Sequence, residues 1–144
     1  MKARRILSMF IAFAICATVC TGFSLASDND VLRASPTLSG YSSKLTAGQS
    51  SGNIKVNYDV MANVEAEELG VYFINIYRAS GSYVTTITGT EENGLIDTNS
   101  DRHRSSYIYE GVSGTSYYAE VTVFAKIDGV SDHRTITTNT IKAP

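Results

Sequence analysis

The segment YYAEVTVFAK, residues 117–126, decides the fold, because its apolar and polar side chains alternate with a period of two. Side chains of a β-strand point to opposite faces in turn, so this pattern predicts a strand with one face on a core. Glu120 and Lys126 fall in the outward set, and finding either of them buried would mean that the register is wrong. We expect the inward-facing side chains to be those of Tyr117, Ala119, Val121, Val123 and Ala125.

Further strands are predicted on both sides of this segment. Residues 54–60 alternate in the same way, and residues 71–78 (VYFINIYR) are nearly continuous in apolar and aromatic side chains, as in a central strand. Shorter strands are expected at residues 83–88, 105–109 and 134–141. Turn sequences separate the strands: Ser51-Gly52-Asn53, Ser80-Gly81-Ser82, Glu92-Asn93-Gly94, Ser113-Gly114 and Asp128-Gly129.

Only residues 62–69 (ANVEAEEL) have helical propensity, and this segment is too short and acidic to form a helix alone. Its glutamates, Glu65, Glu67 and Glu68, predict a solvated loop or a short helical turn. Roughly seven short strands without a long helix favour an all-β fold, an antiparallel β-sandwich. A small barrel is the alternative that the same pattern permits. We expect one β-sandwich domain over residues 36–143.

The residues just before the deciding segment, 111–116, are similar to those of a known family of β-sandwich modules. The run Gly111-Val112-Ser113-Gly114-Thr115-Ser116-Tyr117, followed by the alternating valines, resembles the end of a fibronectin type III or related immunoglobulin-like module. In that family a Gly-Thr-x-Tyr step leads into strand F, and its tyrosine packs as a corner over the preceding turn. The resemblance implies that Tyr117 is buried and bonded near residues 111–114, although the family's usual turn proline and core tryptophan are absent. More broadly, residues 69–143 are similar to small secreted proteins of Gram-positive bacteria of unknown function, and a sandwich by itself implies no activity.

The amino-terminal residues predict where the protein works. Lys2, Arg4 and Arg5 precede an apolar run over residues 6–19, and Ser24-Leu25-Ala26 forms a small-x-small cleavage site. This layout is typical of a secretory signal peptide over residues 1–26, cut before Ser27. The apolar run is shorter than the roughly 20 residues that span a bilayer, which disfavours an uncleaved anchor. Residues 27–35 are polar and without pattern, and we expect a flexible leader there. The predicted location is secreted, extracellular.

A chain without cysteine remains after removal of the predicted signal peptide, residues 1–26. Both cysteines, Cys16 and Cys20, lie inside it, and Ile15 and Val19 stand where a lipoprotein signal needs a small residue. Small secreted domains often depend on disulfides, so this domain must be stable by core burial alone. Three of the 12 basic residues and none of the 14 acidic residues are removed, and 9 minus 14 gives a net charge of −5. This charge argues against nucleic acid or an anionic membrane as partner.

The sequence shows no catalytic signature, so we predict that the protein is not an enzyme and has no catalytic residues and no cofactor. Its histidines, His103 and His133, stand in polar, charged stretches, where we expect solvated loop histidines. The predicted mature chain has no cysteine nucleophile and no Gly-x-Ser-x-Gly elbow. Two isolated histidines also argue against a zinc site, which needs about three ligands at defined spacing.

One segment gives a weak metal signal. Asp97, Asn99 and Asp101 place oxygen ligands at positions one, three and five, as in the opening of an EF-hand calcium loop. Arg102 stands at position six, where the motif needs glycine, and Ile108 at position twelve, where it needs glutamate. Asp, Asn and Ser are also the ordinary residues of a turn. We therefore expect an ordinary turn between strands here and no metal, with calcium as the alternative.

The chain has nine tyrosines, all after the predicted cleavage site, and several alternate with apolar residues that we expect to face inward. An exposed aromatic face stacks on sugar rings or anchors a protein partner. The other interpretation is that tyrosine covers a sheet because of its high β-propensity. The tyrosines concerned are Tyr72, Tyr77, Tyr83, Tyr107, Tyr109 and Tyr118.

The function predicted from the sequence is an exported, non-catalytic module, either a binding protein or a surface-associated accessory protein, whose partner is a protein or carbohydrate surface. Two alternatives stay open. One is a structural subunit of a cell-envelope, spore or matrix layer, which would self-associate through exposed sheet edges. The other is a small extracellular hydrolase, which would need a concave site with converging titratable groups.

Overall fold

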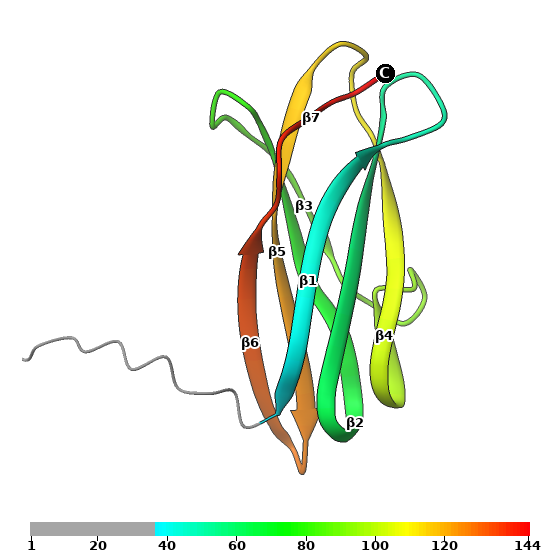
Figure 1. Ribbon diagram of the computed structural model, residues 1–144, viewed down its shortest axis with the longest axis vertical. Helices are drawn as coiled ribbons and strands as arrows, with labels where there is room; N and C mark the ends of the chain where they lie inside the picture. The colour runs from blue at the N-terminus through cyan, green and yellow to red at the C-terminus, as the bar shows by residue number, and fades with distance from the viewer. Residues whose placement is uncertain (1–36) are drawn as a thin grey trace, which may run out of the picture. The chain divides into compact units, whose positions relative to one another are not determined.

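The computed structural model describes residues 37–144, which form an all-β, antiparallel sheet of seven strands (Figure 1). Within these residues no helix is long and apolar enough to cross a membrane. The predicted signal peptide, residues 1–26, and the predicted leader, residues 27–35, lie outside the described residues. The strands are β1 (Leu38–Ala47), β2 (Asn53–Arg78), β3 (Tyr83–Thr88), β4 (Ile96–Glu110), β5 (Ser116–Ile127), β6 (Val130–Thr137) and β7 (Ile141–Lys142).

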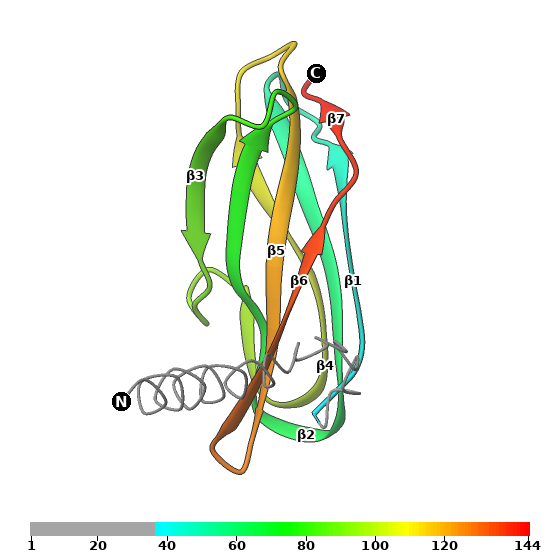
Figure 2. The same ribbon diagram turned by 90° about the vertical axis from the view of Figure 1, so that its left-hand side faces the viewer.

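The long strand β2 organises the sheet, because it pairs with β1, β3, β4 and β5. Its residues 53–61 lie between β1 and residues 102–110 of β4, and we call these three segments the first arm. The rest of β2 pairs with β3, β5 and residues 96–100 of β4, and with β6 and β7 these make the second arm. Both β2 and β4 turn over at the same end, so the sheet curls into a half-barrel (Figures 1 and 2).

The bend of β2 corrects one prediction. Residues 62–69, expected as a loop or helical turn, are strand throughout, and the register with β4 shifts between Met61 and Ala66. Ala62 and Ala66 are buried there, whereas Glu65 is exposed. Small side chains on the inner side let the strand fold over, and Glu67 and Glu68 form ion pairs with Lys126. Pairing with β4 and β5 thus overrides a weak local helix propensity.

The core lies between the two arms. Tyr117, Val121 and Val123 are at most 1% exposed, as the deciding segment predicts. Glu120 and Lys126 are partly exposed, so the predicted register is confirmed. Phe124, in the outward set, is the exception at 3% exposure. It is covered on the outer face by the rings of Tyr72 and His133.

The tyrosine corner that the resemblance implies is present. Tyr117 is 1% exposed, and its hydroxyl accepts a hydrogen bond of 2.9 Å from the backbone N–H of Val112. All five predicted turns contain a glycine with a left-handed φ between 72° and 87°, the conformation for which turns favour glycine.

Several strand boundaries differ from the prediction. The sequence gives no strong alternation over residues 38–47, so β1 was not expected. Strand β4 has 15 residues, far more than the predicted segment 105–109, and residues 134–141 divide between β6 and β7. The all-β, antiparallel class is confirmed. The strands form one continuous hydrogen-bonded sheet, because β2 and β4 belong to both arms.

The two arms meet at two seams. At the first, between β1 and the β6–β7 segment, the side-chain amide of Asn139 pairs with the backbone of Leu45 as a strand would, accepting from its N–H at 2.9 Å and donating to its carbonyl at 3.1 Å. At the second seam the loop of residues 89–95 joins β3 to β4, and its Leu95 side chain is fully buried in the core.

Candidate functional site

Three tyrosines meet on the outer face of the second arm. Strand pairing sets Tyr77 of β2 opposite Tyr118 of β5 on one side and Tyr83 of β3 on the other. The rings of Tyr77 and Tyr118 stack at 10° with centroids 5.1 Å apart, and Tyr83 packs edge-on against Tyr77 at 5.8 Å. Tyr83 is 60% exposed. The cluster therefore presents aromatic area to solvent.

Polar groups hold these rings in place. The Tyr83 hydroxyl lies 2.9 Å from Thr86 Oγ1, which donates to Asn75 Oδ1 at 2.6 Å. The Tyr77 hydroxyl donates to Glu120 Oε2 at 3.1 Å. Loss of solvation, followed by this hydrogen bond to Glu120, raises the pKa of Tyr77. The Tyr77 hydroxyl therefore remains a donor, and hydrogen bonds orient the rings of Tyr77 and Tyr83.

A second ring cluster extends the same face. Tyr72 contacts Phe73, Phe124 and His133 at centroid distances of 4.3, 5.6 and 5.2 Å. A register shift between Val71 and Phe73 places Tyr72 outward, and it is 41% exposed. We call the two clusters together the aromatic face, made of Tyr72, Phe73, Tyr77, Tyr83, Tyr118, Phe124 and His133.

The fold separates the predicted tyrosines into two groups. Tyr72, Tyr77, Tyr83 and Tyr118 belong to the aromatic face, but Tyr107 and Tyr109 do not. Both lie on β4 in the first arm and pack against the core. Burial raises the pKa of Tyr109. The sequence could not separate the two groups, because that requires knowing which arm each strand joins.

The outer face of the first arm has a different chemistry. It contains a hollow of about 450 Å³, and beside it a second hollow of about 430 Å³. Asn57 lines the first hollow and Lys55, the next outward residue of β2, lines the second, and we call the surface that the two hollows cover the polar trough. Its lining includes Ser42, Lys44, Gln49, Asn53, Lys55, Asn57, Asp59, Arg104 and Ile108.

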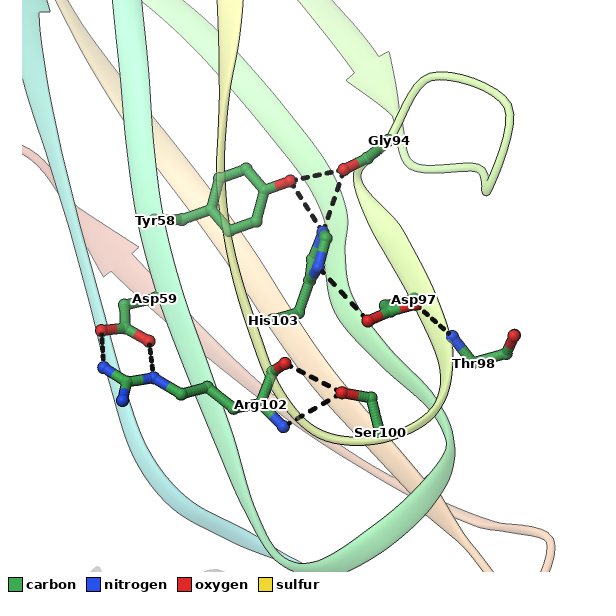
Figure 3. Close-up of polar contacts among 8 residues, drawn as sticks. All are labelled: Tyr58, Asp59, Gly94, Asp97, Thr98, Ser100, Arg102 and His103. Atoms are coloured by element: carbon green, nitrogen blue, oxygen red, sulfur yellow. Dashed lines mark hydrogen bonds and ion pairs between the residues drawn. The ribbon is translucent and has the colours of Figure 1, made fainter.

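A carboxylate at one end of the polar trough is held by two arginines. Arg102 donates to Asp59 through Nε at 3.0 Å and Nη2 at 2.7 Å, and Figure 3 shows this two-bond contact. Arg104 also donates to Asp59 through Nε and Nη2. The hydrogen bond from Arg102, with the further arginine contacts, lowers the pKa of Asp59 to about 2. Asp59 is therefore ionised at neutral pH and orients both guanidinium groups.

Behind the trough, on the inner side, His103 takes part in a polar cluster that Figure 3 shows. The Tyr58 hydroxyl donates to the Gly94 carbonyl at 2.7 Å, and His103 Nε2 lies 2.9 Å from that carbonyl and 3.1 Å from the hydroxyl. His103 Nδ1 is 3.8 Å from Asp97 Oδ2. Burial raises the pKa of Tyr58, which is 3% exposed. These contacts tie the first arm to the loop of residues 89–95.

Both histidine predictions need correction. His103 is a half-buried residue of β4 with hydrogen-bonding partners, so the expected solvated loop histidine is wrong there. His133 is exposed, as expected, but it belongs to strand β6 and stacks on Phe124. Charged neighbours in the sequence suggested loops, whereas on an edge strand they are simply the outward positions.

The weak calcium candidates also lie on a strand. Asp97, Asn99 and Asp101 all belong to β4, so the expected turn between strands is wrong, although Asn99 has a left-handed φ of 51° where the strand bends. Asp97 Oδ1 accepts from the N–H of Thr98 at 3.0 Å. Across residues 37–144, no group of three His, Cys, Asp or Glu side chains is placed to hold a metal ion.

Comparisons with protein-family models, with curated proteins and with solved structures found no match to this chain. The resemblance to fibronectin type III modules therefore stays a prediction. The polar trough was also missed by sequence reasoning. Its signal was present in Lys55, Asn57 and Asp59, which alternate with buried residues of β2, but their neighbours on β1 and β4 could not be known before the strands were paired.

Proposed function

We propose that this chain is an exported, non-catalytic binding module that holds a carbohydrate surface on its aromatic face. The observation that carries the proposal is the convergence of Tyr77, Tyr83 and Tyr118 from three neighbouring strands. Tyrosine supplies apolar area and a polar tip at little cost in side-chain entropy. A rigid sheet that presents such rings suits a repeating, flat ligand.

Carbohydrate is favoured over protein by what surrounds the rings. Asn75, Thr86 and Glu120 place amide, hydroxyl and carboxylate oxygens among them, and these groups suit the many hydroxyls of a sugar. A protein partner usually buries an anchor residue in a fitted pocket. The described pockets lie elsewhere, on the outer face of the first arm.

The finer features of the proposal rest on further observations. An immunoglobulin-like sandwich is supported by the Tyr117 corner and by a core enclosed between two arms. Export is supported by the sequence of residues 1–26, and its test is the amino terminus of the protein recovered from the culture medium, which we expect at Ser27.

The binding test compares tyrosines on the two arms. The protein is sedimented with insoluble cellulose and with chitin, and the bound fraction is measured. We expect binding to at least one polymer, and a loss of about tenfold in affinity for the Tyr83→Ala/Tyr118→Ala variant, because stacked rings contribute most of the contact. The matched control is Tyr41→Ala, since Tyr41 is 44% exposed but lies on β1 of the first arm.

The outcomes separate the alternatives. No binding by the folded parent protein, or an equal loss in Tyr41→Ala, would contradict the proposal. Light scattering gives a second readout: a monomer supports the binding module, whereas open-ended assembly through sheet edges would favour the structural subunit.

A further inference from the structure

We propose that the polar trough is a second binding surface, which takes a linear, carboxylate-bearing polysaccharide. The trough lies on the outer face of the first arm, whereas the aromatic face lies on the second arm. The inference does not depend on the proposed function, because the two surfaces share no residue.

The shape of the trough suits an extended chain. The first hollow, of about 450 Å³, lies on β1, β2 and β4, and the second, of about 430 Å³, lies at the β1–β2 turn and the start of β2, so that the two follow one another from Ser42 to Ser50. The three strands of the first arm span about 10 Å across, which is the width of a single polymer chain rather than of a folded partner. A groove of this form holds a ligand along its length.

The charges of the trough are positive although the protein is acidic overall. Lys44 and Lys55 line the hollows, and no ion pair to either of them is found among residues 37–144. Arg102 and Arg104 share the single carboxylate of Asp59, so this group carries a net charge of +1. Two further carboxylates lie close by: Glu110 stands opposite the lining residue Asn53, and Asp101 interacts with Arg102. Lys44, Lys55, Arg102 and Arg104 still outnumber Asp59, Asp101 and Glu110 by one, so the charge of this surface stays positive. Salt screens the interactions of exposed charges beyond about 10 Å. The trough therefore attracts anions although more distant parts of the protein are negatively charged.

Arg104 is the residue best placed to contact a carboxylate. Its side chain is 69% exposed, while its contacts to Asp59 fix its direction. A guanidinium group has five N–H donors, and Asp59 takes those of two nitrogens, which leaves a donor edge for an anion. Asp59 is thus a positioning residue rather than a ligand contact.

A polysaccharide is favoured over an acidic peptide by the rest of the lining. Ser42, Asn53 and Asn57 offer hydroxyl and amide groups that suit sugar hydroxyls. A peptide usually needs aromatic or aliphatic anchors in fitted pockets. The large side chains of this kind in the described lining are those of Ile108, which is 55% exposed, and Tyr58, which is only 3% exposed and points into the core. The acidic peptide becomes an outcome of the test.

The test uses the mature chain and three polymers of similar length: polygalacturonate, neutral dextran and poly-glutamate. Affinity is measured by titration calorimetry at low and at physiological salt. We expect polygalacturonate to bind and dextran not to bind, with weaker binding at higher salt because added ions screen the contacts. The Lys44→Gln/Lys55→Gln variant should lose about tenfold in affinity, since it removes two charge-assisted contacts.

Two controls make the result specific. Lys142→Gln changes the charge by a single unit on exposed β7, and it should bind polygalacturonate as the parent does. Tyr83→Ala, on the aromatic face, should also leave the affinity for polygalacturonate unchanged. The two proposals can therefore fail independently of each other. The inference is overturned if polygalacturonate does not bind, if poly-glutamate binds as tightly, or if Lys142→Gln weakens binding as much as the double variant.

Discussion

The two seams of the half-barrel are closed in different ways. Between β1 and β6–β7 the closure is polar: one side-chain amide, that of Asn139, satisfies both backbone groups of Leu45. Between β3 and β4 the closure is mainly apolar, because the fully buried Leu95 fills the gap and Tyr58 adds a hydrogen bond to Gly94. At the first seam two strand edges lie side by side without regular backbone pairing, whereas at the second seam a loop places an apolar side chain in the core.

This difference teaches where the stability of a curled sheet resides. An apolar plug contributes in proportion to the area that it removes from water. A polar bridge contributes little net free energy, but it prevents buried backbone groups from being left without partners. We therefore expect the two seams to respond unequally to the loss of one side chain, and the four predictions below test this inequality.

The largest effect is expected at the apolar plug. Leu95→Ala should lower the free energy of unfolding by about 2–5 kcal/mol, because it removes buried methyl groups and leaves a cavity. Urea denaturation followed by circular dichroism measures the change. The matched control is Val64→Ala on the exposed bend of β2, which should shift stability by no more than about 0.5 kcal/mol. Equal small effects for both variants would mean that the loop does not close the second seam.

The polar bridge should give the next largest effect. Asn139→Ala removes two hydrogen bonds and should cost about 1–2 kcal/mol, since solvent near the exposed Asn139 replaces part of what is lost. Hydrogen exchange adds a local readout: the amide of Leu45 should exchange faster, while that of Val71, which donates to Leu95, should change less. Thr140→Ala, at the neighbouring exposed position, should leave both amides protected as in the parent. A loss of stability equal to that of Leu95→Ala would contradict the expected inequality between the two seams.

A smaller, pH-dependent effect is expected from Tyr58. Burial raises its pKa above the ordinary value of 10.0, so the neutral form is favoured in the folded state. The corresponding stability is complete below pH 10 and is lost as the pH rises through the folded-state pKa. Tyr58→Phe should cost about 1 kcal/mol at neutral pH, because Gly94 keeps its contact with His103.

The same variant should also lose less stability than the parent protein between neutral and alkaline pH. Melting temperatures measured across this range check the slope. Tyr77, Tyr109 and Lys126, whose pKa values are also raised, contribute to the alkaline sensitivity that remains. An unchanged slope in Tyr58→Phe would show that Tyr58 does not couple the second seam to pH.

The sequence predicts the antiparallel class, the five turns and the position of Tyr117, because these depend on local pattern and on glycine. It fails at β1 and at the bend of β2, where pairing with distant strands decides the structure. For the same reason, the sequence does not predict the two candidate surfaces. Tyr77 and Tyr109 follow the same alternation in the sequence, yet one lies on the aromatic face and the other packs on the core. Local periodicity assigns a side chain to a face only once the partner strands are known.

The smallest expected effect concerns calcium at the second seam. A calcium ion there would add a third closure, and Asp97, Asn99 and Asp101 would have to bring oxygens within about 2.3–2.6 Å of it. Asp97 instead accepts from Thr98 and faces His103, and Asn99 and Asp101 are exposed. Binding to the folded state alone would raise the melting temperature. We expect no rise at millimolar calcium. A rise that a chelator reverses, and that Asp97→Ala abolishes while Glu91→Ala does not, would make this seam a metal site and reverse the comparison between the two.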